Sequence, residues 1–188
     1  MLTFIVSTTT ILPQHPYLLI KPSNNGYGVF ANKNFSAGEV ICEFHGQLYS
    51  REALPQPYDS VEDHYIQIGE NLYMGPSGEV DDFFNHSCDP NAGLKITATK
   101  AVLVAIKDIS PEQEITWDYS TTMDEDDWEM NGNCGSNNCR GKIKDLKYLP
   151  PEIQQKYLTL DLVPEYIVRK YFPHLRNLGP NSNVHQSN

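Results

Sequence analysis

Residues 85–91 of the chain read NHSCDPN and directly follow the apolar pair Phe83 and Phe84. The stretch places seven mostly polar residues immediately behind two aromatic side chains. Taken alone, it also fits an ordinary well-hydrogen-bonded turn, since Asn, Asp, Ser and Pro are common turn formers. Its meaning therefore depends on the segments that accompany it along the chain.

Two further motifs flank this stretch. GYG at residues 26–28 precedes it, and EITWDY at residues 114–119 follows it. With these three motifs the chain resembles the SET-domain methyltransferases, in which Gly-x-Gly, Asn-His-Ser-Cys-x-Pro-Asn and Glu-Leu-x-x-Asp-Tyr occur in this order. The resemblance extends over about residues 17–141 and includes GEVI at 38–41 and CGSNNCRG at 134–141. A Gly-x-Gly alone would equally fit a structural turn, but three motifs in family order argue against coincidence.

The expected fold is mostly β. The resemblance implies the SET-domain fold, with several small sheets of short strands, a knot-like C-terminal motif and short C-terminal helices. Composition agrees, because 13 prolines, 12 glycines and 11 tyrosines among 188 residues favour many turns and short strands over a helical bundle. Apolar runs predict strands at residues 17–20, 29–31, 40–44, 65–68, 72–74, 102–106 and 114–117, with a loop at 23–28. Proline followed by Glu predicts helices at about residues 153–160 and 165–171.

The chain length suits one compact domain with short appendages. We expect an N-terminal extension at residues 1–16, a SET domain at 17–122, a post-SET-like segment at 123–146, a C-terminal helical segment at 147–176 and a disordered tail at 177–188.

The resemblance implies S-adenosylmethionine as methyl donor. The residues expected to bind it are Gly26, Tyr27, Gly28, Asn85, His86 and Tyr119. Glycines let the backbone lie against a ligand and present its N–H and C=O groups. Asn and His supply donors and acceptors suited to an amino-acid zwitterion and an adenine edge. The alternative for His86 is a buried histidine whose hydrogen bonds are satisfied within the protein.

Tyr119 and Tyr65 are the expected catalytic residues. The acceptor implied by the family is a lysine amine, and keeping that amine neutral costs about 4–5 kcal/mol at pH 7 because its ordinary pKa is near 10.4. By resemblance, the Tyr119 hydroxyl orients the amine beside the transferring methyl, and an unperturbed tyrosine is a poor base at pH 7. Tyr65 and Trp117 either line the lysine channel or belong to the core. Asp118 is expected to hydrogen-bond the local backbone.

Cys88, Cys134 and Cys139 are the candidate metal ligands. Many relatives hold zinc with the cysteine of Asn-His-Ser-Cys and a trailing Cys-x-Cys-x4-Cys. Here the first trailing position is Gly132, so three thiolates leave a tetrahedral structural site one ligand short. The alternatives are a fourth ligand of another type, or a loop that keeps its shape without zinc. Cys42 alternates within an apolar strand and is expected to be core.

The formal net charge of −10 disfavours direct binding to nucleic acid and favours a basic, lysine-containing protein as partner, with a histone tail as one candidate. The acidic run at residues 124–127 is either a solvated loop or part of a mouth that attracts such a peptide. No apolar run approaches the roughly 20 residues that span a bilayer, so no membrane partner is expected.

An intracellular location is expected because the N-terminal stretch reads poorly as a signal peptide. It is cytoplasmic in a bacterial host and nuclear for an enzyme that acts on histones. The rival hypotheses are a non-catalytic module that binds the cofactor or a basic tail, and an enzyme that methylates a small amine or a non-histone protein. The sequence does not disclose the oligomeric state, the substrate lysine or the number of methyl groups added.

Overall fold

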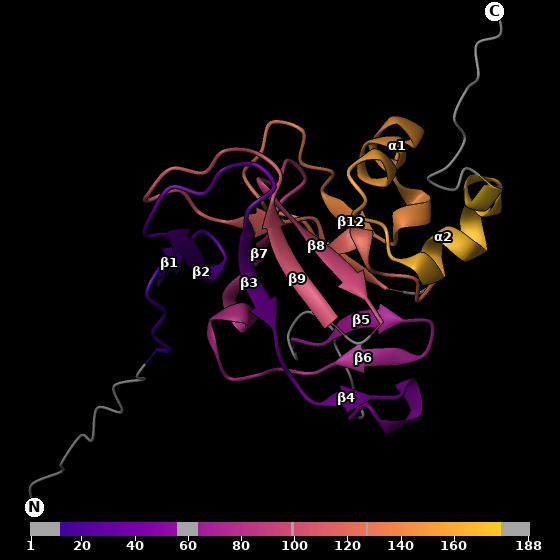
Figure 1. Cartoon of the computed structure of the whole chain (residues 1–188), viewed down its shortest axis with the longest axis horizontal. Coiled ribbons are helices and arrows are strands. Elements are labelled where there is room, and N and C mark those ends of the chain that lie inside the picture. The colour runs from indigo at the N-terminus through magenta and orange to yellow at the C-terminus, as the bar shows by residue number, and fades with distance from the viewer. Residues whose placement is uncertain (1–11, 56–63, 99, 127, 178–188) are drawn as a thin grey trace, which may run out of the picture.

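Most of the regular structure consists of short strands, arranged in five small sheets (Figure 1). The computed structural model describes residues 12–55, 64–98, 100–126 and 128–177. The strands are β1 (Leu18–Ser23), β2 (Gly26–Ala31), β3 (Val40–Phe44), β4 (Leu48–Tyr49), β5 (Ile66–Gly69), β6 (Leu72–Met74), β7 (Asn85–His86), β8 (Ala92–Thr97), β9 (Lys100–Ala105), β10 (Thr116–Trp117), β11 (Glu129–Asn131) and β12 (Lys142–Lys144). The helices are α1 (Pro151–Thr159) and α2 (Glu165–Tyr171).

The sheets are antiparallel with one exception. Two have three strands, in the orders β3-β9-β8 and β4-β6-β5, and two are the hairpins β1-β2 and β11-β12. The fifth pairs β7 with β10 in parallel, although these strands lie far apart in the sequence. This pairing brings the NHSCDPN and EITWDY motifs side by side.

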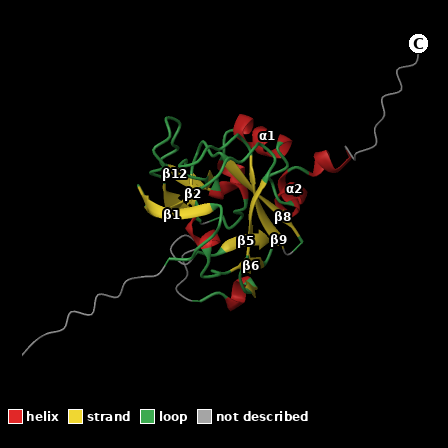
Figure 2. Ribbon diagram, turned by 60° about the vertical axis from the view of Figure 1, so that its left-hand side comes forward, coloured by secondary structure: helices red, strands yellow, loops and turns green. Residues whose placement is uncertain are grey.

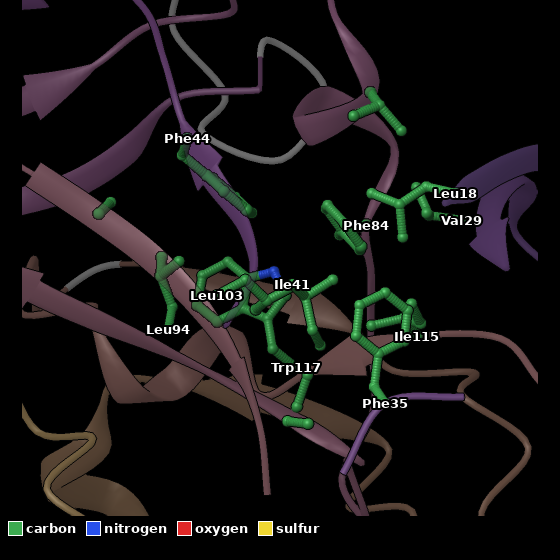
Figure 3. Packing of buried hydrophobic residues seen from close by; sticks show 14 of the residues in the cluster. Leu18, Val29, Phe35, Ile41, Phe44, Phe84, Leu94, Leu103, Ile115 and Trp117 are labelled. Atoms are coloured by element: carbon green, nitrogen blue, oxygen red, sulfur yellow. The ribbon is translucent and has the colours of Figure 1, made fainter. Parts of the chain in front are cut away.

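The main core lies between these sheets. Figure 3 shows Trp117 of β10 packed near Ile41 of β3 and Leu103 of β9, and all three belong to one buried cluster. Phe44 and Phe84 stack in the same cluster with ring centroids 5.6 Å apart. Removal of this apolar surface from water is the main favourable contribution to folding. Trp117 of the EITWDY motif and Phe84, directly before the NHSCDPN motif, therefore anchor these two segments in the core.

A second buried cluster joins the C-terminal helices to the outer side of the β8-β9 hairpin. Successive side chains of β9 point to opposite faces, so Leu103 enters the main core and Val104 enters the second cluster with Leu162 and Ile167. Gly93 of β8 makes this contact close, because a Cβ at that position would lie 2.4 Å from Leu162 Cδ1. Figures 1 and 2 both place α1 and α2 on the β8 side of the molecule.

The expected mostly β SET-domain fold is confirmed, including strand β3, the β5-β6 hairpin and both C-terminal helices. The loop predicted at residues 23–28 is wrong in part, because strand β2 already begins at Gly26. In the β1-β2 hairpin Ser23 pairs with Gly26 and Lys21 pairs with Gly28, so both glycines belong to strand β2. The sequence prediction also missed β8 and the hairpin β11-β12, and α1 begins at Pro151, two residues earlier than predicted.

None of the described helices is long and apolar enough to cross a membrane. All but the first residue of the predicted tail at residues 177–188, and most of the N-terminal extension, lie outside the described residues. The predicted boundaries between segments stay predictions.

Candidate active site

The parallel pair β7-β10 forms the floor of the site. Asn85 lies opposite Thr116, and His86 lies opposite Trp117. Asn91 fastens the two segments together, since its side-chain amide donates to the Glu114 carbonyl (2.8 Å) and its side-chain oxygen accepts the Thr116 N–H (3.0 Å). Asn91, the last residue of the NHSCDPN motif, therefore holds these two segments together, a role that the sequence did not reveal.

Gly28 is needed for close packing beneath the site. A Cβ at Gly28 would lie 2.2 Å from Glu114 Oε1 and 2.8 Å from Asn85 Nδ2. These two atoms are hydrogen-bonded to each other at 2.8 Å, and Asn85 Nδ2 also donates to the Tyr27 carbonyl (3.0 Å). Gly28 thus makes room for Asn85 and Glu114, and the expected room for a ligand stays a prediction. Gly26 instead meets nothing within 4 Å and has φ +85°, a conformation that glycine adopts without strain.

His86 is buried and is held as a neutral ring. Its Nδ1 accepts the Tyr119 N–H at 3.2 Å, so in the neutral imidazole the proton resides on Nε2, which faces Cys88 Sγ at 3.3 Å. Burial lowers the pKa of His86 to about 4, with the nearby Asp118 carboxylate opposing this shift. The ring is therefore uncharged at neutral pH and links the cofactor motif to the backbone of Tyr119.

Tyr119 lies on a short 3₁₀ turn, η3 (Tyr119–Thr121), that directly follows β10. Its hydroxyl donates to the Phe84 carbonyl at 2.7 Å, and its ring packs against Trp117 with centroids 4.7 Å apart. Burial raises the pKa of the Tyr119 hydroxyl well above its ordinary value. The hydroxyl is thus protonated at neutral pH, which suits hydrogen bonding and orientation and excludes a role as general base.

Two cavities meet at Tyr119. The first, which we call the wide cavity, has a volume of about 450 Å³ and is lined by residues of the cofactor motifs, among them Tyr27, Asn85 and His86. The second, the narrow channel, has a volume of about 50 Å³. The residues that line the narrow channel are Phe44, His64, Tyr65, Ile66, Asp81, Asp82, Phe84, Trp117, Tyr119, Thr122, Met123 and Trp128. His64, Asp82, Phe84 and Tyr119 line both.

The charged side chains described along these cavities are acidic. Within the described parts of the chain, no lysine or arginine lines either of them, whereas Asp82 lines both. The Asp82 carboxylate accepts the backbone N–H groups of Ser77 (3.1 Å) and Gly78 (2.7 Å), which fix its position. The junction therefore presents an anionic group to whatever enters from either side.

The structure brings most of the predicted site residues together. Tyr27, Asn85, His86 and Tyr119 line the wide cavity, while Tyr65 and Trp117 line the narrow channel. The Tyr65 ring also meets Tyr49 edge to face, with centroids 5.5 Å apart. Catalytic and binding roles for all of these residues stay predictions.

Sequence reasoning missed the lower part of the channel wall. Thr122, Met123 and Trp128 line the narrow channel but follow the last motif and belong to no recognisable pattern. The predicted local hydrogen bond of Asp118 is confirmed, since its carboxylate accepts the Ser120 N–H at 3.2 Å. The same carboxylate also binds Arg140 and Tyr157, which the local pattern gave no means to predict.

The predicted metal ligands are only partly assembled. Cys88 Sγ and Cys134 Sγ lie with a ring nitrogen of His86 within 4.8 Å of one another. Cys139 Sγ instead donates to the Gly132 carbonyl at 3.6 Å, although Cys139 packs in the same cluster. Burial raises the pKa of the Cys88 thiol to about 12. Burial opposes ionisation of Cys134 too, but hydrogen bonds, beginning with the Cys88 N–H, lower its pKa to about 6.

The fit to a closed zinc site is incomplete. A Cβ at Gly132 would lie 2.8 Å from Ile143 Cδ1, so an apolar side chain stands where a fourth cysteine would be. His86 is a poor substitute, because zinc on Nε2 would require the proton on Nδ1, which already accepts the Tyr119 N–H. Closed structural zinc sites have four ligands. Zinc stays a prediction, and no step of the chemistry below passes through it.

Comparisons with known proteins agree with this geometry. The relatives include the histone-lysine N-methyltransferase mes-4 of Caenorhabditis elegans, 30% identical in an alignment of length 147 that covers 65% of this chain and 16% of the relative. The H3 lysine-4 specific histone-lysine N-methyltransferase of Saccharomyces cerevisiae is 29% identical in an alignment of length 144 that covers 67% of this chain and 13% of that protein. The chain thus spans less than a fifth of the length of these relatives.

Solved structures support the fold. The structure of KRYPTONITE with mCHG DNA and SAH superposes with a TM-score of 0.57 at 24% identity, over 70% of this chain and 30% of that one. Arabidopsis thaliana SUVH6 with SAM gives 0.56 at 24% identity, over 68% of this chain and 32% of that one. A family model described as SET domain matches residues 26–120, half of the chain. The chain therefore belongs to the SET-domain family.

Proposed function

We propose that this chain transfers a methyl group from S-adenosylmethionine to a lysine side chain of a protein. The observation that carries the proposal is the meeting of a wide cavity and a narrow channel with several aromatic side chains at Tyr119, which lines both. A displacement between a bulky donor and a long side chain needs two entrances that converge in line on one point.

The wide cavity suits the methyl donor. When bound, S-adenosylmethionine supplies an electrophilic methyl group on a positively charged sulfur. Its volume of about 450 Å³ lies within the range of small-molecule sites. Asn85, Asn131 and Asn133 supply polar groups, and the neutral ring of His86 places no positive charge beside a cationic sulfur.

The narrow channel suits an unbranched amine. Its aromatic walls desolvate the amine and so favour the neutral form that can attack a methyl group. The Tyr119 hydroxyl orients this amine rather than deprotonating it, because burial raises its pKa. Asp82, at the junction, attracts the cationic side chain before it loses its proton.

A histone tail is the substrate we favour. The net charge of −10 draws in a basic peptide and opposes direct contact with nucleic acid. The two relatives above are named as histone-lysine N-methyltransferases, and one structure of KRYPTONITE, 23% identical to this chain, contains an H3(1-15) peptide as well as DNA. A histone substrate in turn implies a nuclear site of action.

The test is a transfer assay with isotope-labelled donor, offered separately histones, whole-cell protein and a small amine. We expect labelled lysine in protein, with label lost in Tyr119→Phe and retained in Tyr148→Phe, a control at an exposed tyrosine that lines neither cavity. Donor binding without transfer to any acceptor would instead identify a non-catalytic module.

A further inference from the structure

The turn that carries Tyr119 is held at both ends by the C-terminal helices. Asp118 precedes η3 and Thr122 follows it. The Tyr157 hydroxyl of α1 donates to Asp118 Oδ2 at 2.8 Å, and the Tyr166 hydroxyl of α2 donates to the Thr122 carbonyl. Tyr157 and Tyr166 are buried and lie beyond residues 26–120, which the family model matches. They thus hydrogen-bond to the residues on either side of η3.

We propose that Tyr157 and Tyr166 are positioning residues, through which α1 and α2 set the place of Tyr119 and the shape of the narrow channel. The proposal rests on the function proposed above. Within the described parts of the chain, no residue of α1 or α2 lines the wide cavity or the narrow channel. Any influence of these helices on the reaction must therefore pass through the residues that they hold.

The first connection runs through a buried carboxylate. Asp118 is 1% exposed and accepts two hydrogen bonds from the Arg140 guanidinium, at 2.9 and 2.7 Å. Its Oδ2 atom is shared between Arg140 and the Tyr157 hydroxyl. Bidentate, charge-assisted bonds of this kind fix the carboxylate in orientation as well as position. Asp118 precedes Tyr119 and accepts the Ser120 N–H, so its orientation determines how η3 begins.

The second connection joins two segments of the channel wall. The Tyr166 hydroxyl that donates to the Thr122 carbonyl also lies 3.2 Å from the Gln67 carbonyl of β5. Thr122 lines the narrow channel, as does Ile66, the residue before Gln67. A single hydroxyl therefore spans the segment that follows η3 and strand β5. The contact thus fixes the position of these two segments relative to each other.

The test compares Tyr157→Phe and Tyr166→Phe, which each remove one hydroxyl and keep the ring, with Tyr148→Phe as the matched control. All are measured in the full chain well below their melting temperatures. We expect kcat to fall about 10-fold or more in the first two variants, since small displacements of reacting groups are costly. The donor Kd should stay within about 2-fold, because neither hydroxyl lies in the wide cavity.

A merely structural role would lower the melting temperature and leave kcat per folded molecule unchanged, and that result would overturn the proposal. Hydrogen exchange gives a readout that needs no methyl transfer. The amides of residues 120–122 should exchange about 10-fold faster in Tyr157→Phe and Tyr166→Phe than in the control. A wild-type chain that transfers no methyl group would refute the proposed function, while unchanged exchange in both variants would refute the positioning role.

Discussion

The wide cavity and the narrow channel differ in how the chain builds them. Short motifs contribute much of the wide cavity, so several of its residues stand close together in the sequence. The walls of the narrow channel run from Phe44 to Trp128 and lie mostly outside the motifs, and the turn beside them is tied to helices whose described residues line neither of these two cavities. Both cavities are thus assembled from distant segments, but sequence motifs mark the wide cavity far better than the channel.

The largest effect is expected at the point where the two cavities meet. Tyr119→Phe removes the hydroxyl that donates to the Phe84 carbonyl and orients the amine. We expect kcat to fall roughly 100-fold or more, as when a preorganised donor is removed from an active site. Donor affinity should change little, because most of the wide cavity is built by other residues. Single-turnover kinetics and calorimetric titration with donor would measure the two quantities; a large loss of donor affinity would contradict the separation of the two cavities.

Gly28→Ala should damage the wide cavity and spare the channel. The added methyl group would meet Glu114 Oε1 at 2.2 Å and push away the pair formed by Glu114 and Asn85. Overpacking of this kind costs about 1–3 kcal/mol, which corresponds to a roughly 10- to 100-fold weaker donor Kd where the displaced group binds the ligand. Titration with donor checks the result, and Gly93→Ala, which crowds Leu162 in the second buried cluster instead, serves as the control. Equal losses in both variants would point to general destabilisation.

Asp145 should make the channel side of the molecule sensitive to pH. Burial, reinforced by Asp124 and Glu125, raises the pKa of this carboxyl from 3.8 to about 6. The folded state then binds the proton more tightly than the unfolded state, so this group's stabilising contribution is complete below about pH 4 and is lost as the pH rises through 6. The loss amounts to up to about 3 kcal/mol for a side chain with no exposed surface.

Asp145→Asn removes that dependence. We expect urea denaturation at pH 4.5 and 7.5 to give a smaller difference in unfolding free energy for the variant than for the wild type. The amide oxygen can still accept the Asp126 N–H, which the carboxylate accepts at 2.8 Å. An unchanged pH dependence would show that another group titrates in this range.

The smallest effect is expected from Thr122→Val in the channel wall. The Thr122 hydroxyl is buried and has no hydrogen-bond partner among the residues that the structure describes, so an isosteric methyl group should raise the unfolding free energy by about 1 kcal/mol. Thermal and urea denaturation would measure the gain. Lower stability in the variant would indicate that a bound water satisfies this hydroxyl inside the channel.

Sequence reasoning reached the fold and several residues that line the wide cavity for a physical reason. Gly26, Asn85 and His86 belong to strings whose residue types are tied to one backbone conformation and one hydrogen-bond pattern. Tyr157 and Tyr166 carry no such signature, since a tyrosine on an amphipathic helix is ordinarily core. Their hydroxyl partners lie 39 and 44 residues away along the chain, and only the packing of α1 and α2 reveals them. The purpose of Gly28 was likewise open until Glu114 was seen beside it.

The Ile143 side chain behind Gly132 has a practical consequence. A loop fastened by an apolar side chain depends on temperature and on solvent, because hydrophobic burial weakens on cooling and in urea. We therefore expect preparations treated with a chelator to keep this loop ordered and to keep their donor affinity. Cooling or mild denaturant should disorder the loop and weaken donor binding before a chelator does.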